Sequence, residues 1–418
     1  MTGRRVPGSA RRDLDDAGDH VTEPQDPIVL DGPFVTDPHG SYAKLNGAAA
    51  VHRAVTPDGS PVRLVTGYRE VRAATTDPGL SLDKCHAATT GSHGASMPPE
   101  LDAHLLNTDP PEHTRLRRLV ATAFTPRRME GLRDSVQRVT DDLLGRMAPL
   151  GRADIVADLA MPLSMAVICD LLGVPEEDRP DFRGWTNTLN SPAPDAAVRS
   201  REAMRSMHGY LTGLVGQKLR KPAGDLLSAL VAARDDGDRL NEDELVALAF
   251  LLLFGGYNNS ATLIATTVLA LLTHPEHLAA LRMGALGMDA VTEEALRWNS
   301  PTMVAVRRFA REDVDLGPMT VRAGERIWLS WGSANRDPDL FASPEVFDPT
   351  RADSNGHLAF GHGAHYCPGA TLARLENSIA VSALIHRFPA LTPSVPAGEL
   401  RWTESLRVRS LSALPVTF

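Results

Sequence analysis

The sequence predicts a mainly α-helical fold with small β-sheets, and three observations support this prediction. No charged residue occurs between Leu245 and Thr273, a length typical of one long helix. From about residue 128 to 236 the chain has the pattern of successive helices, separated at Pro162 and Pro175. Strand-like runs are short and bounded by turn residues.

The composition is that of a globular protein, and it argues against several classes of function. With 43% hydrophobic and 23% charged residues, the 418-residue chain can bury a large core. A net charge of −9 argues against a general nucleic-acid-binding protein, which needs a basic surface. The three cysteines are far apart in sequence, so they form no disulfide framework and fit a reducing cytoplasm.

Residues 1–25 mix arginine pairs with acidic residues and contain no apolar run. This pattern predicts a disordered N-terminal tail without a signal peptide. We therefore expect a single domain over residues 26–418 and a cytoplasmic location.

The first half of the chain alternates short strands, loops and helices. Residues 62–66 read as a strand, whereas 83–106 show no period and predict a long surface or lid loop. His113 and Arg117 lie one turn apart on a predicted helix, where a solvated basic face is the plainest interpretation. The Ser-Pro-Ala-Pro run at 191–194 predicts a flexible connection between helices.

The long helix has a start signal and an unusual centre. Asn241 and Glu244 form a plausible capping pair before Leu245–Thr273. A membrane span would fit the length, but the polar centre at 255–260 would be costly in lipid. We therefore predict a helix of roughly 40 Å through the protein core, at about 1.5 Å per residue. The polar, glycine-containing centre suggests a ligand lying close to the backbone.

The second half predicts a helix followed by strands. Glu294 and Arg297 have i, i+3 spacing, which alone indicates an ordinary surface ion pair. Thr302–Val306 reads as a strand, Val314–Leu329 as a hairpin, and Leu400–Phe418 as a closing hairpin.

A glycine-rich loop with one cysteine precedes the last predicted helix. Phe360, Gly363, His365, Cys367 and Gly369 follow the spacing Phe-x-x-Gly-x-His-x-Cys-x-Gly, and a helix pattern begins at once. A cysteine at a helix N-terminus favours the thiolate, which can be an axial ligand of haem iron. The alternatives are an inert buried cysteine, and a zinc site formed with nearby histidines, although structural zinc usually takes paired cysteines.

This loop resembles the haem-ligand loop of the cytochrome P-450 family. Three further motifs occur in the family's order, so the resemblance covers about residue 30 to 418. It implies a P-450-like fold with haem b between the long distal helix and the Cys loop, and Cys367 as the axial iron ligand. It also implies that the haem propionates are held by His113, Arg117, Arg308 and His365.

The same resemblance implies a buried support for the loop. Glu294 and Arg297 match the family's Glu-x-x-Arg pair. Where the family often carries an arginine that completes this pair, the chain has Val346, and Arg351 is the nearest candidate for the role. The residue after the cysteine is Pro368, which has no N–H to donate to the sulfur.

The centre of the distal helix departs from the family pattern Ala/Gly-Gly-x-acid-Thr. Gly256 is retained, but Asn258 and Asn259 replace the acid and the alcohol that route protons to the oxygen. An amide can hydrogen-bond but cannot titrate. We expect Phe254 and Tyr257 to line the distal pocket with these catalytic positions. As substrate contacts we predict Thr302, Met303 and Val304, for which plain strand packing is equally plausible.

The resemblance implies a monooxygenase that activates O2 with electrons from a ferredoxin and its NAD(P)H-dependent reductase. The expected substrate is a small hydrophobic secondary metabolite; polyketide, peptide and terpenoid compounds remain open. Because of the amide pair, oxidative coupling or peroxide-driven chemistry is an alternative. Two others are a non-catalytic haem sensor and a haem-free binding protein.

Overall fold

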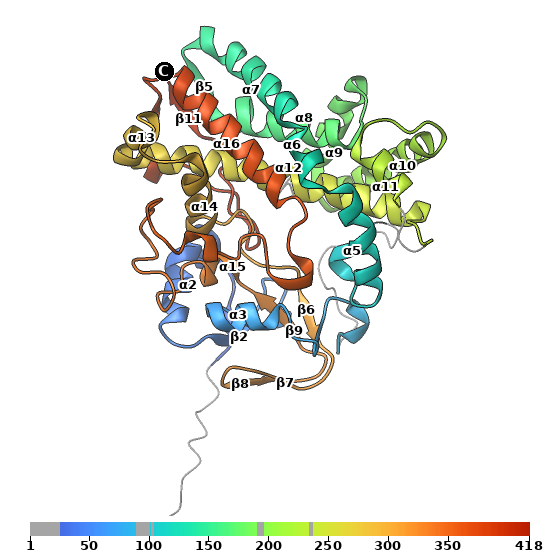
Figure 1. The fold of residues 1–418 in the computed structure, drawn as a ribbon. Coiled ribbons are helices and arrows are strands. Elements are labelled where there is room, and N and C mark those ends of the chain that lie inside the picture. Colours follow the sequence, from blue (N-terminus) through green and yellow to red (C-terminus); the bar gives the residue numbers. More distant parts are fainter. Residues whose placement is uncertain (1–25, 89–100, 102–103, 190–195, 234–236) are drawn as a thin grey trace, which may run out of the picture.

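The computed structural model describes residues 26–88, 101, 104–189, 196–233 and 237–418. Within these residues the chain is mainly helical with small β-sheets, which confirms the predicted fold class (Figure 1). The predicted tail (1–25), much of the predicted lid loop (89–100 and 102–103) and the connection at 191–194 lie outside the described residues.

The helices other than the two that flank the site cover most of the chain's length. They are α1 (Gly32–Thr36), α2 (Pro38–Asn46), α3 (Tyr68–Ala74), α5 (Glu112–Ala123), α6 (Pro126–Glu130), α7 (Arg133–Met147), α8 (Met161–Leu172), α9 (Arg179–Leu189), α10 (Ala196–Arg220), α11 (Leu226–Ala232), α13 (Pro275–Arg282), α14 (Met288–Trp298) and α15 (Trp331–Ala334).

Helix α12 (Glu242–Thr273) is the long helix that the sequence predicts, and it runs through the centre of the molecule (Figure 1). The Asn241 side chain accepts from the Glu244 N–H while the Glu244 side chain accepts from the Asn241 N–H, so the predicted capping box is present. By length and composition, α12 and the helical stretch Ile155–Leu172 could each span a membrane, but 61% of each apolar window is buried inside the fold. Packing within the protein core therefore accounts for their apolar character.

The largest sheet has six strands in the order β1 (Ile28–Val29), β2 (Val51–Val55), β3 (Pro61–Val65), β9 (Arg326–Leu329), β6 (Arg308–Ala310) and β4 (Leu80–Ser81). Strand β3 confirms the predicted strand near residues 62–66. The predicted hairpin at 314–329 is only partly correct. Strands β7 (Val314–Leu316) and β8 (Met319–Val321) form it, whereas β9 pairs with β3 and β6 because its alternate residues Ile327 and Leu329 are needed in the core of the large sheet.

Two other predicted strand regions differ from the structure. Thr302–Val306 is not a continuous strand; Thr302 and Val304 each form one isolated bridge, to Val408 and Ser330. The C-terminal segment forms a single bridge between residues 402 and 411, and then β11 (Pro415–Thr417) pairs with β5 (Arg152–Asp154) and β10 (Thr392–Pro393). In both regions tertiary partners far along the chain override the local pattern.

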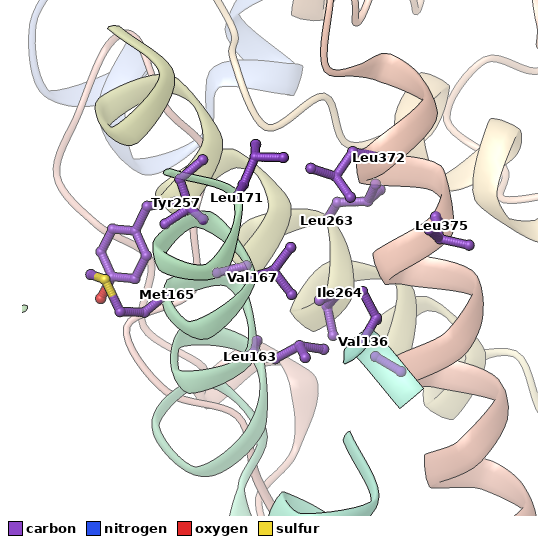
Figure 2. Close-up of a cluster of buried hydrophobic side chains, with 14 of the residues drawn as sticks. Val136, Leu163, Met165, Val167, Leu171, Tyr257, Leu263, Ile264, Leu372 and Leu375 are labelled. Atoms are coloured by element: carbon purple, nitrogen blue, oxygen red, sulfur yellow. The ribbon is translucent and has the colours of Figure 1, made fainter. Parts of the chain in front are cut away.

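The main core lies where α8, α12 and α16 (Ala370–Arg387) pack together. Figure 2 shows Leu263 of α12 and Leu372 of α16 directed toward each other, with Leu171 of α8 beside them. This packing places the N-terminal end of α16, and the Cys loop before it, next to the centre of α12.

Candidate functional site

A cavity of about 300 Å3 lies between the centre of α12 and the Cys loop. Its lining is mostly apolar, with leucines from α8 and α12, and it includes the cysteine of the loop. The lining residues that the sequence analysis selected are His113, Arg117, Gly256, Asn259, Thr302, Arg308, Phe360, His365, Cys367 and Gly369. The fold therefore brings together residues from widely separated motifs.

Two glycines give the Cys loop its shape. Gly361 and Gly363 have φ values of 74° and 72°, a left-handed conformation that favours glycine. A Cβ on Gly363 would lie 2.7 Å from Cγ2 of Thr76, so no side chain fits there without movement. The loop closes when the Cys367 N–H donates to the Phe360 carbonyl at 2.9 Å, and α16 begins at Ala370. The predicted tight turn and helix start are both present.

The cysteine lies at the start of α16. Burial is the largest effect on the Cys367 thiol and raises its pKa, while the N–H groups of Gly369 and Ala370, together with two arginines, act in the opposite direction. Pro368 contributes no N–H, so the sulfur receives hydrogen bonds only from the two positions beyond it. Gly369 is close to the sulfur, since a Cβ there would lie 3.8 Å from Sγ.

The histidines near the loop do not form a zinc site with the cysteine. In the part of the chain that the structure describes, no group of three or more His, Cys, Asp or Glu side chains could hold a metal ion. His357 Nε2 lies 3.2 Å from Glu293 Oε2, and the His365 ring packs on His113 at a centroid distance of 3.9 Å. Cys367 thus has no second metal ligand from these residues.

Cationic and neutral donors gather on one side of the cavity. Burial lowers the pKa of Arg308 to about 10, and among the described residues no carboxylate forms an ion pair with it. Arg117 donates to the Tyr366 carbonyl at 2.6 Å and still lines the cavity. Burial also lowers the pKa of His113, and that of His365 to about 3, so both rings are neutral at physiological pH. A buried guanidinium without an anion fits a haem propionate.

The predicted support pair is present and completely buried. Arg297 donates to Glu294 through Nε at 2.8 Å and through Nη2 at 2.7 Å, and both side chains are 0% exposed. Arg351 Nε reaches the same carboxylate at 3.1 Å, in the place proposed for it. Arg297 also donates to the carbonyls of residues 335, 344 and 346, which tie α14 to the segment leading into the Cys loop.

The centre of α12 presents only part of its predicted residues to the cavity. Gly255, Gly256, Asn259 and Ser260 line it. A Cβ on Gly255 would meet nothing within 4 Å, whereas one on Gly256 would lie 3.0 Å from Ile168 Cδ1. The small residue at 256 therefore serves the packing of α8, and the one at 255 leaves the backbone open to the cavity.

Three predicted pocket residues of α12 do not line the cavity. Tyr257 is 2% exposed and packs in the core near Met165 of α8 (Figure 2). Phe254 is 43% exposed and stacks on Phe250 at 5.9 Å. Asn258 is also absent from the lining. The reason is helical geometry, because each residue turns by about 100° and only one face of α12 meets the cavity.

The predicted substrate contacts also divide. Thr302 lines the cavity, and its hydroxyl donates to Asn259 Oδ1 at 3.2 Å, while Asn259 Nδ2 donates to the Gly255 carbonyl at 3.0 Å. Met303 and Val304 are wrong as substrate contacts, because both are 1% exposed and pack in a separate apolar cluster beneath the sheet. For these two residues the alternative of plain packing holds.

The sequence analysis missed a carboxyl group at the cavity. Glu376 of α16 lines it, although the side chain is only 3% exposed. A pattern could have indicated it, because Leu372, Glu376 and Ala380 recur every four residues and so place an acid within an apolar stripe.

Comparisons with known proteins agree with this site. The family model "Cytochrome P450" (hyphenated here as P-450) matches residues 195–284 and 287–401. Cytochrome P-450 107B1 of Saccharopolyspora erythraea is 43% identical over 94% of this chain and 98% of its own length. The monooxygenase PikC of Streptomyces venezuelae is 45% identical over 92% of this chain and 91% of its own.

A solved structure extends the similarity to the fold. The ligand-free P-450 monooxygenase TamI superposes with a TM-score of 0.84 at 40% identity, and 94% of both chains is covered. With the sequence identities, the matching fold and the Cys loop facing the long helix, this chain belongs to the cytochrome P-450 family and is a cytochrome P-450 monooxygenase.

Proposed function

We propose that the cavity binds haem b with the Cys367 thiolate as the axial iron ligand. The observation that carries this proposal is that Cys367 and the buried, anion-free Arg308 line the same cavity. Arg117, His113 and His365 lie on that side as further propionate partners. Bound haem supplies the O2 activation that the family performs.

The residues of the chain position the other components. The Thr302–Asn259–Gly255 hydrogen bonds hold the Asn259 amide in place across the open part of α12. This amide orients bound water or substrate by hydrogen bonding, because it has no titratable proton to give. The apolar leucines of α12 and α8 around it exclude water from the rest of the cavity.

We propose a hydrophobic secondary metabolite of the polyketide or macrolide type as the substrate. The mostly apolar lining supports a substrate of low polarity. Relatives 39% and 40% identical to this chain are named 6-deoxyerythronolide B hydroxylase and mycinamicin IV hydroxylase/epoxidase. Electrons come from a ferredoxin and its NAD(P)H-dependent reductase in the cytoplasm.

The positions of two surface arginines limit where a ferredoxin binds. Arg374 pairs with Glu293 at 2.6 Å and lies over the Phe360 ring, and Arg115 pairs with Glu112, Asp238 and Glu244. Both charges are thus already neutralised within the chain. They contribute less to an acidic partner than their positions in the sequence suggest.

Optical titration followed by turnover tests the proposal. The purified protein is titrated with macrolactones, linear polyketides, a terpenoid and a cyclic peptide, and each binding compound is incubated with ferredoxin, reductase, NADPH and 18O2. We expect a type-I shift for a polyketide and a product with one labelled oxygen atom. A shift confined to the terpenoid or peptide would reject the substrate class. A coupled product without label would favour oxidative coupling instead.

A further inference from the structure

The cavity contains a carboxyl group for which the proposed haem site has no use. Glu376 of α16 is buried and lines the cavity. Ser164 of α8 donates to Glu376 Oε2 at 3.2 Å, and Ser260 of α12 is a second hydrogen-bond partner of this carboxyl. Figure 2 shows the three helices that provide these residues packed side by side. One carboxyl therefore joins three helices at the edge of the site.

The surroundings of Glu376 keep a proton on its carboxyl. Burial is the largest effect and raises its pKa to about 8, while the hydrogen bonds of Ser164 and Ser260 act in the opposite direction. Within the described part of the chain, no charged group contributes to this shift. The carboxyl is thus mostly protonated at neutral pH and can donate a proton.

The other polar groups of the cavity do not offer a comparable proton. Asn259 is an amide, and Asn258 does not face the cavity. The two arginines stay charged, and burial keeps the two histidines neutral. Glu376 is the only carboxylic acid among the described residues that line the cavity. Ser260, which also lines it, is the hydroxyl that connects this acid to the open space beside Asn259.

We propose that Glu376 and the Ser260 hydroxyl form a proton path into the cavity that replaces the missing acid–alcohol pair of α12. This inference rests on the proposed haem site. Reduction of O2 by a monooxygenase consumes electrons, here from ferredoxin, and an equal number of protons. In each transfer the Glu376 O–H gives its proton to Ser260 Oγ while the Ser260 proton passes to water in the cavity. The carboxylate then takes a proton from bulk water, so charge and atoms balance.

An infrared titration tests the protonation state independently of activity. The haem-loaded wild-type protein should show a protonated-carboxyl stretch that disappears as the pH rises through about 8. This band should be absent from Glu376→Gln and should shift in Ser260→Ala, which removes one hydrogen bond. A wild-type spectrum without a band that depends on Glu376 would overturn the proposal.

Product yield tests the role in turnover. Glu376→Gln and Ser260→Ala should each lower product per NADPH at least about tenfold and release hydrogen peroxide, because positioned proton donors contribute about a hundredfold or more. Ser260→Thr keeps the hydroxyl and should restore most of the yield. As a control, Thr266→Val removes a buried hydroxyl of α12 that bonds only to helix carbonyls outside the cavity, and should leave the yield unchanged.

The outcomes separate the two proposals. If the wild-type protein binds no haem, the proposed function fails. If Glu376→Gln loads haem normally, gives the wild-type CO spectrum and keeps the wild-type yield, only the proton path fails. A variant with normal haem loading and lost yield that Ser260→Thr recovers in the serine series supports the path, because a purely structural role would not separate yield from loading.

Discussion

Replacement of Arg297 by methionine should destabilise the protein by about 4 kcal/mol. Breaking a completely buried ion pair costs about 3–5 kcal/mol. Here Glu294 keeps one bond, from Arg351, but the carbonyls of residues 335, 344 and 346 lose their donor as well. Unpaired buried acceptors cost about 1–3 kcal/mol each, although relaxation recovers part of this. Such a loss is a large part of a total stability of about 5–15 kcal/mol.

Urea unfolding of the haem-loaded protein measures this effect, and the chain offers a matched control. Glu130 and Arg133 have the same i, i+3 spacing, but their side chains are 60% and 52% exposed. Arg133→Met should therefore change the unfolding free energy little. Arg351→Met should fall between the two, because Glu294 retains Arg297. Equal losses for Arg297→Met and Arg133→Met would refute the reasoning that burial makes the first pair important.

Three further predictions concern the cavity. Between the ordinary Glu pKa of 4.5 and the folded-state value of about 8, the folded protein binds more protons at Glu376 than the unfolded chain. The unfolding free energy of wild type should therefore fall relative to Glu376→Gln as the pH rises from about 5 to 8, and parallel pH curves from urea titrations would contradict this. Pro368→Leu restores an N–H beside the sulfur and should raise the Fe(III)/Fe(II) potential in a spectroelectrochemical titration; no change or a fall would reject that account. Asn258→Asp combined with Asn259→Thr should raise product per NADPH in the Glu376→Gln background, and an unchanged yield would show that the amide pair is not linked to proton delivery.

The sequence predicted the elements whose signals are local. The capping box at Asn241, the length of α12, and the glycine turns before Cys367 depend on residues close together in the chain, and all are present. Glu294 and Arg297 also have local spacing. Their complete burial could not be derived from that spacing, which is the same as that of the exposed pair Glu130 and Arg133.

The errors concern which face of an element meets the cavity. On α12, Tyr257 and Asn259 are two residues apart, yet one packs in the core and the other lines the cavity. Met303 and Val304 are as apolar as substrate contacts would be, but the sheet covers them. Glu376 was missed because its environment is formed by α8 and α12, which are distant in the sequence. Tertiary packing decides such orientations.

The reduced, CO-bound absorption spectrum of wild type and Cys367→Ser tests the central claim most directly. If Cys367 is the axial thiolate, the wild-type protein should bind haem and show the red-shifted Soret band of a thiolate-ligated CO complex. Cys367→Ser should lose that band, while retaining the fold as judged by circular dichroism. A thiolate-type spectrum that survives in Cys367→Ser, or a folded wild-type protein that takes up no haem, would contradict the account.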